Sequence, residues 1–294
     1  MTFAPPAGPC HGDQRCHERA AIVDHRPIAE QTWRLRIESP AIAAAAVPGQ
    51  FAMVRLPDRT DPLLGRPLAV YGVFPGPDGA PRYVDFVYAI HGRFTTALAG
   101  RPSGENVLVW GPLGNGFAIP PVDHLVLVAG GIGQTALVAL ARERAGLARY
   151  GSPSREVPRA SRITFCWGAR TASLFGDLDD FRSTGCDVHL ATLDGSIGHR
   201  GTVIDLLDSL AGEGHLGATG VHVVTCGPDA MMAAVARWTA THAMPCTVSL
   251  ETPMACGIGI CFTCVAPIRD ADGGWDYRRT CVEGPVFDAA AVVW

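Results

Sequence analysis

The sequence predicts a multi-domain α+β protein with an N-terminal antiparallel β-barrel, an open parallel α/β sheet and a small C-terminal tail. Short β-rich segments separated by turn residues fill residues 21–119. Strand and helix patterns then alternate over 120–250, and residues 251–294 are rich in cysteine. Residues 1–20 show no pattern and are expected to be a disordered tail. A chain of 294 residues has room for two such domains.

Composition excludes several classes of function. The net charge is −4 and no basic block is present, so a nucleic-acid partner is not expected. All 24 basic residues are arginine, which excludes a Schiff-base lysine and a Walker-type phosphate lysine. No export signal and no apolar run of about 18–20 residues is visible, so we expect a cytoplasmic protein with no membrane segment.

The predicted barrel rests on regular short strands with glycine and proline between them. The segments are WRLRIES (33–39), FAMVRLP (51–57), LAVYGVF (68–74), YVDFVYAI (83–90) and NVLVWGP (106–112). Their spacing suits a small barrel or sandwich.

Two glycine turns mark the ligand-binding edge of the predicted parallel sheet. The turn AGGIGQT (129–135) contains Gly130, Gly131 and Gly133 where a strand ends and a helix begins. Backbone N–H groups at such a turn favour an anionic diphosphate, although many similar turns bind nothing. Cys226 and Gly227 repeat the layout in TCGPDAMM (225–232), which could equally be only a tight strand-to-helix turn.

Four cysteines form the most specific pattern. Cys256, Cys261, Cys264 and Cys281 have the spacing C-x4-C-x2-C-x16-C. This spacing matches a plant-type [2Fe–2S] site better than a zinc site, which usually uses two C-x2-C knuckles. Gly257 and Gly259 allow the tight loop, and the apolar residues between the cysteines are expected to keep water away: Ile258, Ile260 and Phe262.

The other six cysteines are scattered and are expected to be small apolar residues: Cys10, Cys16, Cys166, Cys186, Cys226 and Cys246. The Cys/His-rich stretch 10–17 lies in the unpatterned tail and is expected to be disordered.

The order of the motifs GRPLAVY, GPLGNGF, GGIG and CGP resembles the ferredoxin–NADP reductase superfamily. The tail, from SLETPMACGIGICFTC to CVEGPVF, is similar to that of the electron-transfer subunits of type B dihydroorotate dehydrogenases. The resemblance covers roughly residues 21–288.

The resemblance implies an FAD site in the barrel. The family's Arg-Pro-x-Ser segment is Arg66, Pro67, Leu68 and Ala69 here, and its second segment is Val87, Tyr88 and Ala89, followed by Phe94 and Thr95. Ala69 lacks the usual hydroxyl, Ala89 lacks a basic side chain and Phe94 replaces a glycine. Arg93 is the candidate to supply the missing charge. The alternatives are a core aromatic for Tyr88 and a surface ion pair for Arg66.

The resemblance also implies NAD at the α/β domain, with Cys226 positioning the nicotinamide, and a [2Fe–2S] cluster on the tail. An FMN-containing partner, in a heterotetramer, would oxidise dihydroorotate in pyrimidine biosynthesis and pass electrons through the cluster and FAD to NAD⁺. A flavin is also expected on chemical grounds, since hydride transfer moves two electrons and the cluster one. Arg170 could meet a 2′-phosphate, but Asp194 opposes one, so NAD is favoured over NADP.

Two alternatives remain from the sequence. One is a related reductase that serves a ferredoxin, a polysulfide or an oxygenase. The other is a zinc-stapled binding module with no redox role.

Overall fold

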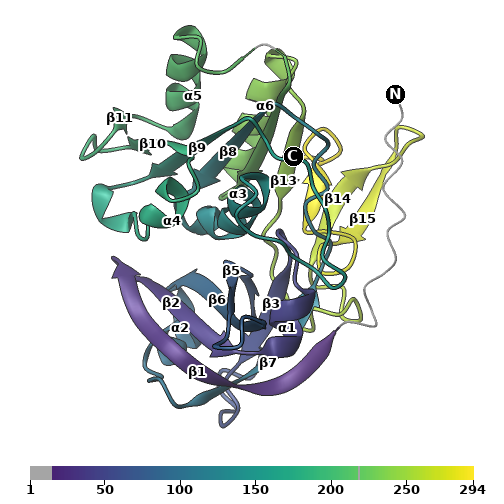
Figure 1. Ribbon diagram of the computed structural model, residues 1–294. Helices are drawn as coiled ribbons and strands as arrows, with labels where there is room; N and C mark the ends of the chain where they lie inside the picture. The colour runs from purple at the N-terminus through teal and green to yellow at the C-terminus, as the bar shows by residue number, and fades with distance from the viewer. Residues whose placement is uncertain (1–14, 218) are drawn as a thin grey trace.

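The computed structural model describes residues 15–217 and 219–294. Figure 1 shows the barrel below, the α/β domain above it, and the C-terminal tail along one side of both. Within the described residues, no helix is long and apolar enough to cross a membrane.

The barrel is a seven-stranded antiparallel sheet in the order β4-β3-β7-β1-β2-β6-β5. Its alternating buried side chains enclose an apolar core that includes Leu35, Phe86 and Val109. Two short helices, α1 and α2, join its strands. The elements are β1 Cys16–Ala29, β2 Thr32–Glu38, α1 Pro40–Ala45, β3 Phe51–Arg55, β4 Arg66–Ala69, β5 Gly72–Pro75, β6 Pro81–Ala89, α2 Gly92–Ala99 and β7 Asn106–Leu113.

The predicted tail needs correction at its end. Strand β1 begins at Cys16, and Cys16 is already in register with Gly111 of β7. Residues 16–20 therefore belong to the barrel sheet, because their hydrogen-bond partners lie far along the chain. Cys10 and the rest of residues 1–14 lie outside the described residues.

The α/β domain is a second seven-stranded sheet in the order β11-β10-β9-β8-β12-β13-β16. All its pairs are parallel except β13 with β16. Apolar clusters cover both faces, as expected for a parallel sheet flanked by helices. The elements are β8 His124–Gly130, η2 Gly131–Ala136, α3 Val138–Arg144, β9 Arg162–Ala169, η3 Ala172–Leu174, α4 Asp179–Arg182, β10 Asp187–Thr192, β11 His199–Arg200, α5 Val203–Gly212, β12 Val221–Cys226, α6 Asp229–Thr241, β13 Cys246–Ser249 and β16 Val286–Asp288.

The tail is tied to both domains. After the cysteine loop, β14 (Val265–Arg269) and β15 (Trp275–Arg279) form a hairpin, and β16 then adds an edge strand to the α/β sheet. The start of the tail packs on the barrel, where Met254, Cys264 and Cys281 share a cluster with Met53 and Leu113. The tail is thus held in place on two sides.

An ionic network joins the barrel to the α/β domain. The guanidinium of Arg34 in β2 donates to Asp177 at 2.9 Å and to Asp180 at 2.8 Å. Asp180 also accepts from Arg142 at 2.6 Å and from the Tyr71 hydroxyl at 2.9 Å. These bonds fix the two domains on either side of a large cavity.

Candidate functional site

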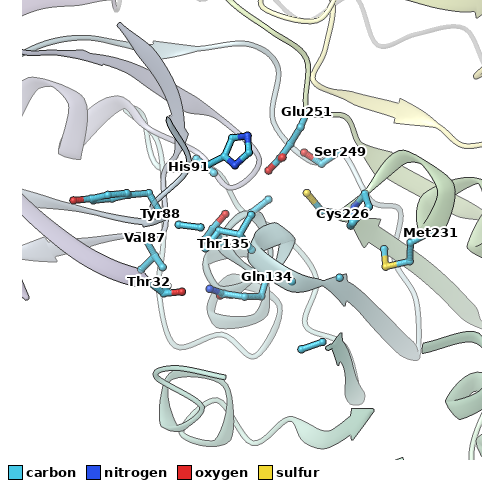
Figure 2. A pocket seen from close by; sticks show the side chains of 18 of the residues that line it. Thr32, Val87, Tyr88, His91, Gln134, Thr135, Cys226, Met231, Ser249 and Glu251 are labelled. Atoms are coloured by element: carbon cyan, nitrogen blue, oxygen red, sulfur yellow. The ribbon is translucent and has the colours of Figure 1, made fainter. Parts of the chain in front are cut away.

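A cavity of about 1530 Å³ lies between the barrel and the α/β domain. Most single-ligand pockets are smaller, at about 300–1,000 Å³, so this one has room for more than one small molecule. Residues from β4, β6, the two glycine turns and the segment after β13 line it. Figure 2 shows several of the lining side chains, among them Tyr88 of β6, Thr135 and Cys226 of the glycine turns, and Glu251 after β13.

The barrel wall of the cavity contains the predicted segment Arg66, Pro67, Leu68 and Ala69. The Arg66 guanidinium donates to the carbonyls of Leu64 at 3.3 Å and Gly65 at 3.0 Å. No carboxylate among the described residues forms an ion pair with it. The side chain is therefore exposed, charged and available to an anion in the cavity.

Tyr88 lines the cavity and is also a core residue of the barrel. Its hydroxyl is 2.8 Å from Nε2 of His25, and Nδ1 of His25 is 2.6 Å from the carbonyl oxygen of Arg101. A carbonyl only accepts, so Nδ1 carries the proton and Nε2 accepts from Tyr88. Burial lowers the pKa of His25, which favours this neutral form. His25 was missed in the sequence because its partner lies on another strand.

The segment around α2 departs from the prediction at two positions. Thr95 lines the cavity and its hydroxyl accepts the backbone N–H of His91 at 2.6 Å, but Phe94 is buried in the barrel core with 1% exposure. Arg93 forms an ion pair with Asp61 and is not part of the cavity wall. Ala89 does line the cavity with Val87, so this geometry gives no support to the expectation that Arg93 compensates for Ala89, which stays a prediction.

His91, which the sequence did not single out, lines the cavity instead. It stands at the N-cap position of α2, directly before the first turn of the helix. Its only sequence signal is its place directly before the helix.

The two glycine turns meet at the carboxyl edge of the sheet. A Cβ on Gly133 would lie 2.2 Å from the carbonyl oxygen of Cys226, and one on Gly227 would lie 2.9 Å from the backbone nitrogen of Gly130. Gly130 and Gly131 line the cavity, while Gly133 and Gly227 pack behind its wall. The glycines therefore let the ends of β8 and β12 approach closely.

Cys226 faces the cavity beside Glu251, a residue that the sequence analysis missed. Burial raises the pKa of the Cys226 thiol well above its usual range, so the thiol is neutral. The cavity walls that surround the Glu251 carboxyl and the charge of Asp229 raise its pKa, although its side chain is exposed to the open cavity. Glu251 comes two residues after β13, at the same edge of the sheet. Its position just after a strand is the feature of the sequence that could have indicated a ligand-binding residue.

The cysteine loop begins where the cavity wall ends. Thr252, Met254 and Ala255 line the cavity, and Cys256 follows directly. Gly257 and Gly259 have φ values of +72° and +86°, as predicted for a tight loop. The predicted shield is wrong, since Ile258, Ile260 and Phe262 are 41%, 74% and 62% exposed. The apolar cover lies instead on the inner side, over Cys264 and Cys281.

The four cysteines influence one another's pKa values. Hydrogen bonds from Thr263 and from Cys256 lower the pKa of the Cys261 thiol to about 6. Burial, together with contact with Cys264, raises the pKa of Cys281 to about 12. No group of three or more His, Cys, Asp or Glu side chains in the described part of the chain is arranged to hold a single metal ion. Four cysteine thiols on one loop and the segment after it are the donor set that a [2Fe–2S] cluster uses.

Of the scattered cysteines, Cys166, Cys186, Cys226 and Cys246 are buried and Cys16 is half-buried. Burial raises the pKa of Cys166 and Cys246 to about 12. These thiols behave as small apolar residues, as predicted.

Residues 251–293 match the family model of the iron–sulfur cluster binding domain of dihydroorotate dehydrogenase B. The "Dihydroorotate dehydrogenase B (NAD(+)), electron transfer subunit" of Desulforamulus reducens is 34% identical over 268 residues, which cover 91% of this chain and 94% of the relative. The protein of the same name from Bacillus caldolyticus is 32% identical, covering 94% of this chain and 98% of the relative.

Solved structures agree with the fold. An NADH-dependent reduced ferredoxin–NADP oxidoreductase, studied for flavin-based electron bifurcation, superposes with a TM-score of 0.75 at 28% identity. The match covers 94% of this chain and 90% of that one. The ferredoxin reductase of carbazole 1,9a-dioxygenase shares the fold at 21% identity, with a TM-score of 0.64 over 82% of this chain and 68% of that one.

The family is thus shown by sequence identity over nearly the whole chain, by the cysteine domain and by the fold, and this chain belongs to the family of electron transfer subunits of dihydroorotate dehydrogenase B.

Proposed function

We propose that this chain passes electrons between a dihydroorotate-oxidising, FMN-containing partner and NAD⁺, using a [2Fe–2S] cluster and FAD of its own. The observation that carries the proposal is the continuity of the two sites. The segment 252–255 forms cavity wall and leads directly into Cys256, and Thr263, between two of the cysteines, lines the same cavity. Cofactors held in the two places would be neighbours, as electron transfer requires.

The barrel side of the cavity fits FAD. Among the described residues the Arg66 guanidinium pairs with no carboxylate and can serve a diphosphate, and the first turn of α2 follows His91 and contains Thr95, which both line the cavity. The ring of Tyr88, held by His25, offers a fixed flat wall. Ala69 and Ala89 contribute no hydrogen-bonding side chain, so in this proposal Arg66, the helix end and His91 carry the recognition of the anion.

The α/β side fits a nicotinamide dinucleotide. Gly130 and Gly131 bring backbone close to the cavity, and the neutral Cys226 thiol lies beside Glu251 where the two glycine turns meet. In this proposal Cys226 and Glu251 position the nicotinamide. Arg170 lines the outer end of the cavity, while Asp194 accepts hydrogen bonds from the N–H and hydroxyl of Ser196.

When bound, the flavin exchanges a hydride with the nicotinamide and single electrons with the cluster. The role of the protein is to hold these groups next to one another and to limit access of water. Cys256, Cys261, Cys264 and Cys281 would hold the irons, with Met53, Leu113 and Met254 packed over the inner side.

The outer side of the cysteine loop suits a partner protein. Exposed apolar side chains gather on the loop and on the adjoining β14–β15 hairpin: Ile258, Ile260, Phe262, Trp275 and Tyr277. Exposed aromatic and aliphatic groups of this kind mark protein interfaces. We propose that the FMN-containing catalytic subunit covers this surface, in a heterotetramer with two copies of each chain.

The test is a reconstitution. The isolated chain should oxidise NADH with an artificial acceptor but should not oxidise dihydroorotate, and the FMN-bearing partner should add dihydroorotate-dependent NAD⁺ reduction. Cys261→Ser should remove most of the iron and the coupled reaction while sparing much of the NADH–acceptor activity. Cys16→Ser, in strand β1 outside the cluster, is the matched control and should keep both. Dihydroorotate oxidation by the isolated chain, or coupling without the cluster, would refute the proposal.

A second candidate is a reductase subunit that serves a ferredoxin-linked partner. The structural match to an NADH-dependent ferredoxin–NADP oxidoreductase at 28% identity favours it as the runner-up. Isolation of the complex from cells decides between the two, since only the first predicts an FMN protein that oxidises dihydroorotate.

A further inference from the structure

Thr263 lies between the two cysteines of the C-x2-C segment and contacts one of them. Its hydroxyl Oγ1 is 3.1 Å from Sγ of Cys261 and donates to it. The same residue lines the large cavity. It therefore belongs both to the wall of the proposed flavin site and to the immediate surroundings of a proposed iron ligand.

The four sulfurs differ in their surroundings. Cys256 Sγ accepts the backbone N–H of Ile258 at 3.4 Å, a longer bond. Cys264 and Cys281 are 2% and 0% exposed and pack among apolar side chains. Within the described residues, Thr263 is the one side chain whose hydroxyl donates to any of these four sulfurs. Cys281 also has a backbone hydrogen bond from Gly259, so what sets Thr263 apart is that its donor is a side-chain hydroxyl, which a substitution can remove.

A hydrogen bond to a ligand sulfur has a defined effect on an iron–sulfur cluster. Reduction adds a negative charge, part of which resides on the sulfurs, and a donor stabilises that charge. Donors to the sulfurs therefore raise the reduction potential, while burial among apolar groups disfavours the added charge.

We propose that the Thr263 hydroxyl is a positioning residue that raises the reduction potential of the cluster at the boundary with the flavin cavity. The proposal rests on the proposed function, because it requires a [2Fe–2S] cluster on these cysteines. A cofactor in the cavity would cover this side of Thr263 and protect its hydrogen bond from competition by water.

The experiment is a redox titration of the purified holoprotein followed by electron paramagnetic resonance. Thr263→Val keeps the shape of the side chain and removes the hydroxyl, and should lower the midpoint potential. A tenfold change in the reduction equilibrium is expected, which is about 59 mV for one electron. Thr263→Ser restores a hydroxyl and should return the potential most of the way to the parent value.

Thr252→Val is the matched control. Thr252 also lines the cavity, but its hydroxyl is 2.5 Å from that of Thr280, which in turn donates to the carbonyl of Cys264 at 3.0 Å. Its removal leaves every bond to a sulfur in place, so the potential should stay at the parent value.

The outcomes are separable. A parent protein without the [2Fe–2S] signal would overturn the proposed function and this inference together. A cluster-bearing Thr263→Val protein with the parent potential would overturn the inference alone. If valine prevents cluster assembly, Thr263→Ala removes the hydroxyl with less bulk. An unchanged midpoint potential in the Thr263→Ala protein would likewise overturn the inference alone.

Discussion

The indole N–H of Trp110 in β7 donates to the backbone carbonyl of Cys256 over a distance of 2.9 Å. This bond joins a strand of the barrel to the first cysteine of the loop, 146 residues later. The side chain of Trp110 also packs with Met53 and Leu113, which lie under Gly257. The barrel therefore supports the loop at the point where the cavity wall becomes the cluster site.

Trp110→Phe should loosen the cluster while FAD stays bound. The change keeps an aromatic ring but leaves a half-buried carbonyl without its donor, at a cost of about 1–3 kcal/mol. Loss of iron to a chelator, followed by visible absorbance, should be several-fold faster than in the parent. Trp275→Phe, on the exposed hairpin, is the control and should lose iron at the parent rate. Equal rates for Trp110→Phe and the parent would show that this bond does not hold the loop.

Gly133→Ala should weaken NADH binding more than FAD binding. A Cβ there would lie 2.2 Å from the carbonyl oxygen of Cys226 and 2.6 Å from the nitrogen of Gly227, so the ends of β8 and β12 must separate. The KM for NADH with an artificial acceptor should rise at least tenfold, while the FAD content should change little.

Gly212→Ala is the control for this glycine. A Cβ on Gly212 would meet no atom within 4 Å, and the residue ends helix α5, far from the cavity wall. Its KM should equal that of the parent. A parent-like KM for Gly133→Ala would mean that the sheet edge absorbs the methyl group without moving.

The sequence predicted the order of the domains and the cysteine loop because these depend on local patterns. Strand alternation, glycine turns and the C-x4-C-x2-C spacing are all visible within a short window. His25, His91 and Glu251 were missed because their place in the site depends on strands that meet only in the fold. Phe94 was misplaced, and the role expected of Arg93 is left without support, for a related reason, since a family motif does not reveal whether a substituted side chain turns toward the core or pairs with a distant carboxylate such as Asp61.

Asp85→Asn should destabilise the barrel strongly. The carboxylate is fully buried and accepts from Nε of Arg34 at 2.7 Å and from Nε of Arg36 at 2.6 Å. Removing this charge takes away the carboxylate partner of Arg36 and leaves Arg34 with Asp177 and Asp180 alone, and breaking a buried pair in this way costs about 3–5 kcal/mol. Urea unfolding followed by tryptophan fluorescence should show the loss.

Asp58→Asn is the comparison for this prediction. Asp58 is 65% exposed and forms only long ion pairs, at 3.7 Å with Arg101 and 3.9 Å with Arg19, so its loss should cost at most about 1 kcal/mol. Similar unfolding midpoints for the two variants would mean that the buried network contributes no more than a surface pair.

The free energy of unfolding should fall as the pH drops from about 6.5 to about 4. Burial lowers the pKa of both His124 and His222 to about 4, whereas the unfolded chain binds protons near 6.5. As the pH falls below 6.5, these two histidines take up protons in the unfolded chain but not in the folded protein. Proton binding therefore stabilises the unfolded state, and the free energy of unfolding decreases. His222 illustrates the cause, since Nε2 lies 2.8 Å from the Thr247 hydroxyl and Nδ1 has no partner among the described residues.

His222→Gln should reduce this pH dependence. Each histidine contributes up to one proton to the difference in bound protons between the unfolded and folded states. One proton corresponds to a slope of about 1.4 kcal/mol in the free energy of unfolding per pH unit. Urea unfolding between pH 4.5 and 6.5, a window set by the pKa shifts above, measures the slope. The slope of the variant should be lower by about one proton, and a slope equal to that of the parent would show that His222 is protonated equally in both states.

Arg66→Ala and Arg93→Ala together test which arginine recognises the flavin diphosphate. Arg66 lines the cavity and has no ion-pair partner among the described residues, whereas Arg93 pairs with Asp61 away from the cavity. A guanidinium on a diphosphate makes charge-assisted bonds worth about 1.5–3 kcal/mol. Arg66→Ala should therefore weaken FAD binding by about 10- to 150-fold, as measured by fluorescence titration of the apoprotein with FAD.

Arg93→Ala should bind FAD within about twofold of the parent, because its ion pair is exposed and contributes about 0–1 kcal/mol. The reverse order would mean that the first turn of α2 rearranges on binding and brings Arg93 to the diphosphate. Parent-like affinity in both variants would leave the α2 N-terminus and His91 as the groups that bind the anion.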